Sequence, residues 1–154
     1  MLSDSQIIER YGQAGDYSQF ISIVLPYPMR IAWDTKVSVN RMQCHKKAAS
    51  AFLAVFNDLL ITYGYDKIKE LGIDLFGGCV NVRPMRGSKK KWSRHAWGIA
   101  IDLDPSRNKL KEKKTTARFA RPEYKPMIDI FYKHGFISYG VERGIDYMHF
   151  ELNV

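Results

Sequence analysis

Hydrophobic residues recur along the chain at spacings that predict both helices and strands. A short helix is expected over 4–11, and a further helix over 122–134, where a proline stands at the first position. The longest helix is expected at about 41–63, because apolar residues recur there at helical spacing. Asn40 is a suitable N-cap for it, and Gly64 follows as a stop.

Alternating or continuous apolar runs, bounded by turn residues, predict strands in other parts of the chain. The predicted strands are 74–83, 98–104, 136–139 and 147–152. Segment 20–33 is apolar but contains two prolines, so it is expected to be an extended or looped segment on the core. Helices and strands do not alternate regularly, which favours an α+β domain with a small, mostly antiparallel sheet flanked by helices. The 154 residues fit a single domain, 1–154.

The chain is strongly basic, with a net charge of +8. This charge favours an anionic partner, which could be nucleic acid, an acidic lipid or a cell-wall polymer. The cations gather in two segments on either side of strand 98–104, and the second segment is expected to be a mobile loop. The first segment holds Arg83, Arg86, Lys89, Lys90, Lys91 and Arg94, and the second holds Arg107, Lys109, Lys111, Lys113, Lys114, Arg118 and Arg121.

Cysteine usage and apolar stretches bear on the compartment. Cys44, within the predicted long helix, and Cys79 form no CxxC pair, so both are expected to be free thiols of a protein made in a reducing compartment. Residues 1–10 lack the features of a secretory signal. The longest apolar stretch, 48–61, is interrupted and too short to span a bilayer, so no membrane anchor is expected.

The segment that carries the candidate chemistry is 93–102, which reads SRHAWGIAID. From Gly98 onward, alternation places isoleucine and leucine side chains on one face of the strand, where they pack on the core. Glycine and alanine, followed by Asp102, lie on the other face, and these small side chains leave space beside the carboxylate. His95 precedes the strand at a distance from which a turn could fold its imidazole towards Asp102.

A third candidate ligand lies near the end of the chain. In the predicted strand 147–152, His149 lies on the polar face, opposite two apolar side chains. Asp146 and Glu151 flank it. Zinc hydrolases typically use three protein ligands and leave a fourth position to water. Together with His95 and Asp102, His149 would complete such a set.

These residues resemble a known family. The pattern Ser-x-His-x-x-Gly-x-Ala-x-Asp, followed near the C-terminus by acid-x-x-His, is similar to that of the VanY/VanX-type D-alanyl-D-alanine peptidases, a zinc group that includes lysostaphin-type enzymes and the hedgehog domain. All fixed positions of the first motif are present between Ser93 and Asp102. The resemblance covers about 71–152 and implies a hedgehog/DD-peptidase-like fold with one Zn²⁺. The small size and the Asp-x-x-His variant most resemble the phage endolysin branch.

The resemblance implies a role for each matching residue. His95, Asp102 and His149 match the zinc ligands, and Asp146 matches the general base, for which Glu151 is a rival. Arg83 matches the arginine that polarises the scissile carbonyl, and Arg86 competes for that role. Ser93 matches a residue that supports the site or binds substrate. Such a set would activate water, accept and return its proton, and stabilise the oxyanion.

The predicted function is therefore zinc-dependent hydrolysis of peptidoglycan stem peptides, by a monomer. The endolysin resemblance implies an L-alanyl-D-glutamate endopeptidase, made in the host bacterial cytoplasm without a signal peptide and acting on the wall after release. A D-alanyl-D-alanine carboxypeptidase is the alternative. A basic nucleic-acid-binding module is a distant one, disfavoured because the basic segments lack interleaved aromatic residues. A hedgehog-like structural zinc domain is disfavoured by the acidic residue Asp146.

Overall fold

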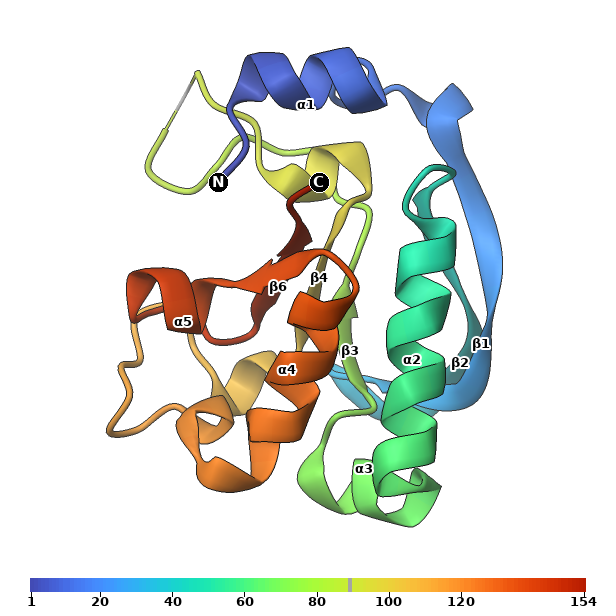
Figure 1. Ribbon diagram of the computed structural model, residues 1–154, viewed down its shortest axis with the longest axis vertical. Helices are drawn as coiled ribbons and strands as arrows, with labels where there is room; N and C mark the ends of the chain where they lie inside the picture. Colours follow the sequence, from blue (N-terminus) through green and yellow to red (C-terminus); the bar gives the residue numbers. More distant parts are fainter. Residues whose placement is uncertain (89) are drawn as a thin grey trace.

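The computed structural model describes residues 1–88 and 90–154 (Figure 1). Lys89, one of the cations in the first basic segment, lies outside the described residues. The described chain forms a six-stranded sheet in the order β2-β1-β3-β4-β6-β5, flanked by helices. Of these neighbouring strands only β1 and β3 are parallel, which confirms the predicted α+β class with a mostly antiparallel sheet. The strands are β1 (Phe20–Ile31), β2 (Asp34–His45), β3 (Leu75–Gly78), β4 (Ala100–Leu103), β5 (Phe136–Ser138) and β6 (His149–Leu152).

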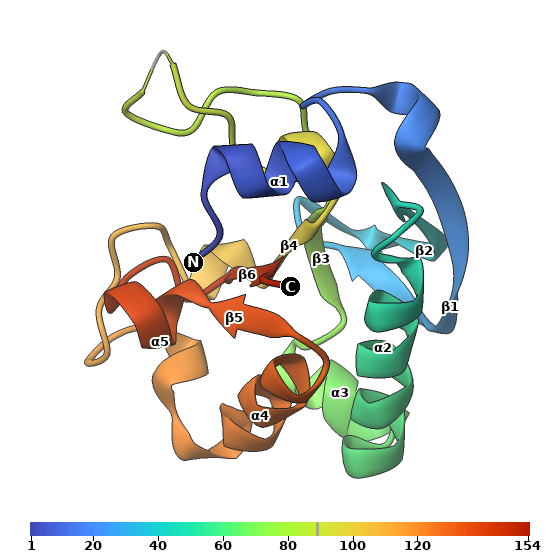
Figure 2. The same cartoon turned by 45° about the horizontal axis from the view of Figure 1, so that its top comes forward.

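Helices α2 and α4 cover one face of this sheet (Figures 1 and 2). Aromatic side chains join them to it: the ring of Phe131 on α4 stacks on that of Phe150 on β6, with centroids 4.0 Å apart. The face of the sheet that carries Phe150 is thus the core face. The helices are α1 (Asp4–Tyr11), α2 (Ala49–Tyr63), α3 (Tyr65–Leu71), α4 (Lys125–Lys133) and α5 (Tyr139–Arg143).

The long helix predicted at 41–63 is only partly correct. Its C-terminal part is α2, which Gly64 ends as expected, but residues 41–45 belong to β2. Met42 and Cys44 are buried while their neighbours Arg41 and Gln43 are exposed, and this alternation is that of a strand. Pairing with β1 overrode the apparent helical spacing, and Cys44 lies in a strand instead of a helix.

The segment predicted as extended or looped is the twelve-residue strand β1. The register of its pairing with β2 shifts between Val24 and Met29. Pro26 and Pro28 lie within this shift, where the missing N–H groups interrupt no regular ladder. Two prolines therefore did not prevent a long strand.

Helix α1 lies apart from α2 and α4 (Figures 1 and 2). The N-terminal segment that contains it contacts the C-terminal residues. Ser3 caps α1 through a capping box with Gln6. The Tyr11 hydroxyl donates to the carbonyl of Val154 at 2.7 Å, and the backbone N–H of Leu2 donates to Asn153 Oδ1 at 3.0 Å. The N-terminal residues are therefore part of the packed structure.

The second basic segment is a loop, as expected, with short 3₁₀ turns at Pro105–Arg107 and Arg118–Ala120. Asn108 is fully buried within it. Its Nδ2 donates to the carbonyl of Asp104 at 3.0 Å, and its Oδ1 accepts from the N–H of Phe119 at 2.8 Å. One buried amide thus holds the two ends of the loop together.

Among the described residues, no helix has the length and apolar character that a membrane crossing requires.

Candidate metal centre

The centre of the site is the pairing of β4 with β6. Asp102 lies directly opposite His149 in this antiparallel pair, and Ile101 lies opposite Phe150. Because Phe150 faces the core, alternation places Asp102 and His149 together on the other face. Gly77 on β3 makes room beside them, since a Cβ there would lie 3.0 Å from the carbonyl oxygen of Asp102. At this position a side chain would push β3 and β4 apart.

His95 reaches the same face through a tight turn. It lies in the 3₁₀ turn Arg94–Trp97, where the hydroxyl of Ser93 accepts from the N–H of His95 at 3.3 Å. Gly98 ends the turn with φ 69°, and a Cβ on it would come within 2.7 Å of the backbone nitrogen of His45. The ring of His95 is oriented by its Nδ1, which lies 2.7 Å from the carbonyl oxygen of Cys79.

The structure brings the three predicted ligands together. One ligand atom from each of His95, Asp102 and His149 lies within 4.8 Å of the others. His95 Nε2 is 3.2 Å from Asp102 Oδ2, and His149 Nδ1 is 3.2 Å from Asp102 Oδ1. His95 Nε2 is buried without a hydrogen-bond partner. Two imidazoles and a carboxylate are a ligand set that fits a divalent ion such as Zn²⁺. The ion would also give His95 Nε2 the partner that no hydrogen bond supplies.

The charges within the cluster are strongly coupled. Burial raises the pKa of Asp102, but His95 and His149 outweigh this effect and hold that pKa well below its usual range. Burial lowers the pKa of His149, but hydrogen bonds to Asp102 and Glu151 outweigh burial and raise it to about 9. The raised pKa favours the protonated ring in the absence of metal, and a divalent ion bound at this ring would displace a proton.

Glu151, a rival candidate for the base, is engaged elsewhere. Its Oε1 lies 2.8 Å from His149 Nε2, and its Oε2 lies 3.7 Å from Arg94 Nε. The side chain is almost completely buried. Side-chain alternation in the sequence places Glu151 on the same face of β6 as His149. Only the folded structure shows that Glu151 contacts Nε2 of that ring.

Asp146 lies in the turn before β6 in an unusual conformation, with φ 58°. Its N–H donates to the carbonyl of Leu110 at 2.9 Å, and its carbonyl accepts from the N–H of His149 at 3.1 Å. Burial raises the pKa of its carboxyl, while the positive charges of His149 and Arg86 oppose that rise. A non-glycine residue in the left-handed region is strained, and such strain is typical of functional sites.

A cavity of about 260 Å³ opens beside the cluster. The two candidate arginines both line it, together with Ser93, Asp102, Asp146 and His149. Arg94, Lys111 and Arg143 add positive charge to its wall. Arg83 is partly buried, with Nη1 3.3 Å from the carbonyl of Pro84, whereas Arg86 is exposed.

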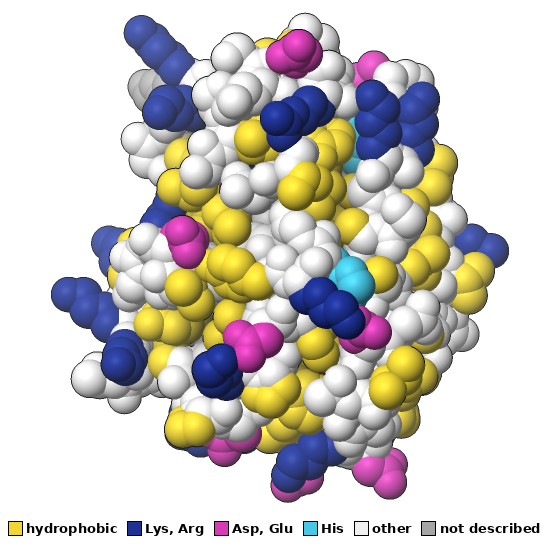
Figure 3. Space-filling model, in the orientation of Figure 1, with side chains coloured by type: hydrophobic (Ala, Val, Ile, Leu, Met, Phe, Trp, Pro, Cys, Tyr) yellow, Lys and Arg dark blue, Asp and Glu magenta, His cyan; other side chains and the backbone are white. Residues whose placement is uncertain are grey.

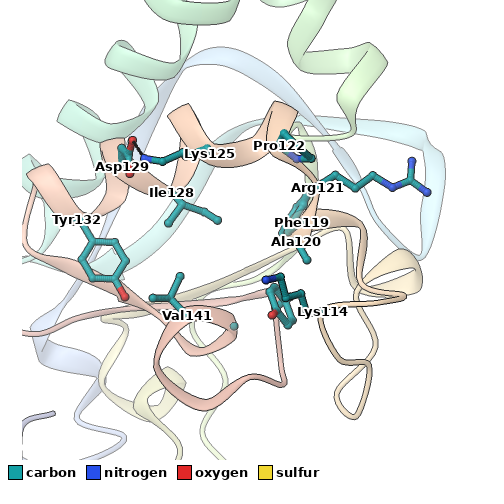
Figure 4. Close-up of a pocket in the computed structure, with 12 residues that line it drawn as sticks. Lys114, Phe119, Ala120, Arg121, Pro122, Lys125, Ile128, Asp129, Tyr132 and Val141 are labelled. Carbon is teal, nitrogen blue, oxygen red and sulfur yellow. Dashed lines mark hydrogen bonds and ion pairs between the residues drawn. The ribbon is translucent and has the colours of Figure 1, made fainter.

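A larger cavity, of about 610 Å³, lies on the other side of α5. Figure 4 shows Ile128 and Tyr132 of α4 facing Val141 across it, with Phe119 and Lys114 at one end. Its walls are mostly apolar, and none of the three candidate ligands lines it. On the face shown in Figure 3, lysine and arginine side chains are scattered among apolar ones and do not form one continuous patch.

Comparison with known proteins gives a match that covers the candidate metal centre. A search of curated proteins returned no significant match. Residues 86–152 match a peptidase family model described as D-alanyl-D-alanine carboxypeptidase. The matched region includes the three candidate ligands and Asp146. The match supports the VanY-like peptidases and does not support the endolysin branch in particular. Over this part of its sequence, the chain is similar to the D-alanyl-D-alanine carboxypeptidases of the M15 peptidases.

Proposed function

We propose that this chain is a single-domain, zinc-dependent peptidase that hydrolyses the stem peptides of peptidoglycan. The observation that carries the proposal is the convergence of His95, Asp102 and His149 beside a cationic cavity, with Nε2 of His95 buried and without a hydrogen bond. The family match over 86–152 supports the peptidase class independently of this geometry.

In the proposed mechanism, His95, Asp102 and His149 would hold a zinc ion, which would supply a water nucleophile near neutral pH. Asp146 would accept the proton of the attacking water and return it to the leaving amine. Arg86 or Arg83 stabilises the negative charge that develops on the scissile carbonyl oxygen, because both line the same cavity. Ser93 holds His95 in its turn through the hydroxyl that accepts from the histidine N–H.

Two scissile bonds remain candidates, and they share a chemical feature. A D-Ala-D-Ala substrate ends in a free carboxylate, and the D-glutamate of a stem peptide, which is linked through its side chain, carries a free α-carboxylate when it is not amidated. Either bond therefore places a carboxylate on the leaving-group side. The arginines and lysine in the cavity wall suit that charge. The family description favours the carboxypeptidase, and the endolysin-type endopeptidase remains the second candidate.

Digestion of purified cell wall distinguishes these possibilities. Released D-alanine would identify the carboxypeptidase, and new N-terminal D-glutamate would identify the endopeptidase. Both products should disappear with a chelator and return when zinc is added. If neither product forms under zinc-replete conditions, and the zinc-bound protein retards DNA at physiological salt, the basic residues serve nucleic-acid binding and the proposal is wrong.

A further inference from the structure

We propose that Glu151 is a positioning residue for the metal ligand His149, and that Arg94, which itself contacts Leu2 and Asp4 of the N-terminal segment, holds Glu151 in place. The inference rests on the proposed metal centre and adds residues that lie behind it. It also gives α1, which lies outside the region of the family match, a part in the site.

The contact between Glu151 and His149 is short and excluded from water. Glu151 Oε1 lies 2.8 Å from His149 Nε2, and the two side chains are 2% and 7% exposed. A neutral histidine has one protonated nitrogen, and the carboxylate favours the proton on Nε2. The lone pair then lies on Nδ1, the nitrogen that faces Asp102.

The ring of Tyr139 provides a second restraint. It lies against the His149 imidazole with centroids 4.1 Å apart and an interplanar angle of 35°. The guanidinium of Arg143 lies over the Tyr139 ring at 3.8 Å. The tyrosine limits tilting of the imidazole, while the carboxylate of Glu151 limits its rotation about χ2.

Arg94 connects this pair to the start of the chain. Its Nη1 lies 2.6 Å from Asp4 Oδ1, and its Nη2 donates to the carbonyl of Leu2 at 2.7 Å. Its Nε is buried, has no hydrogen-bond partner, and is 3.7 Å from Glu151 Oε2. The positive charge of Arg94 therefore compensates the buried carboxylate, which would otherwise be costly to keep ionised.

Such a carboxylate–histidine pair orients a metal ligand and raises its basicity. Loss of a partner of this kind typically weakens metal binding by about 10- to 100-fold. The zinc dissociation constant of the full chain, measured by competition with a chromogenic chelator, tests this directly. Glu151→Gln keeps the shape and removes the charge, so we expect weakening in that range. Glu142→Gln removes a carboxylate from an exposed position on α5 and should leave the constant unchanged.

If Glu151 had only a structural role, Glu151→Gln would lower the free energy of unfolding of the metal-free protein, measured in the presence of chelator. It would not change the zinc affinity of the folded protein. Equal affinities of Glu151→Gln and wild type would therefore overturn the inference while leaving the metal centre intact. If wild type itself fails to bind zinc, the proposed function fails with it.

A second measurement does not depend on any variant. In the zinc-bound wild-type protein, ¹⁵N spectra of the histidine rings should show the His149 proton on Nε2. A proton on Nδ1 would overturn the inference even if Glu151→Gln proved unable to fold.

Discussion

Asp102 and His149 face each other across neighbouring strands, with 3.2 Å between Asp102 Oδ1 and His149 Nδ1. They are separated by 47 positions in the sequence. The backbone hydrogen bonds of the antiparallel pair β4 and β6 fix the relative position of the two residues, so this half of the centre is rigid. The turn that carries His95 then decides whether the set of ligands is complete.

His95→Ala should abolish stoichiometric zinc retention, because it removes one of the three candidate ligands. Metal analysis after gel filtration measures the effect. His134→Ala is the matched control, since His134 lies on α4's C-terminal end and contacts Asp58 at 2.6 Å. Stoichiometric zinc in the His95 variant would remove this residue from the centre.

Asp146→Asn should keep zinc and the fold but lower turnover by about 10²- to 10⁴-fold, the usual contribution of a general base. The reason is that the amide keeps the size of the side chain but cannot accept the proton. Turnover of a stem-peptide substrate and zinc content are measured on the same preparation. Near-normal turnover would assign the base to another residue.

The acid limb of kcat/KM should respond to the charge of Arg86, which faces the carboxyl of Asp146. Burial raises the pKa of Asp146, and a base works only when deprotonated, so activity is full above that pKa and falls as the pH drops through it. Arg86 lowers this pKa. Arg86→Gln should therefore move the limb further up, whereas Arg83→Gln should leave it in place. An unchanged limb in Arg86→Gln would contradict the assignment.

The arginine that stabilises the oxyanion can be identified from the same two variants. Removing such a donor costs about 3 kcal/mol of transition-state stabilisation, which lowers kcat by about 10²-fold. Both arginines line the cavity. We expect the variant of the arginine that faces the carbonyl to lose kcat to this extent and the other variant to change mainly KM. Saturation kinetics on a stem peptide separate the two effects. Equal, small losses of kcat in the two variants would exclude both arginines from stabilising the oxyanion.

Gly98→Ala should destabilise the protein and weaken zinc binding. The new Cβ would meet the backbone nitrogen of His45 at 2.7 Å, in addition to the cost of φ 69°, which is about 1–2 kcal/mol. Gly144→Ala is the control, with φ 72° and nothing within 4 Å of the added atom. Thermal unfolding should show a larger loss at Gly98. Equal losses would mean that the close contact is relieved without cost.

The alternation of side chains in 98–104 and 147–152 was readable in the sequence, and with it the polar faces that carry Asp102 and His149. The same kind of pattern was misleading at 41–45, where apolar spacing fits a helix and a strand alike. Pairing with β1 settled that choice. Helix α3 was not predicted at all, since its seven residues give little periodicity.

The sequence by itself determined the class of fold and the residue types of the candidate metal centre, because side-chain alternation and motif spacing are local properties. Only the tertiary structure decided that His95 Nε2 is buried without a hydrogen bond, that Glu151 contacts the far nitrogen of His149, and that Arg94 connects this pair to Asp4. These contacts join segments up to 90 positions apart. Their geometry depends on how strands and turns pack, which no local pattern encodes.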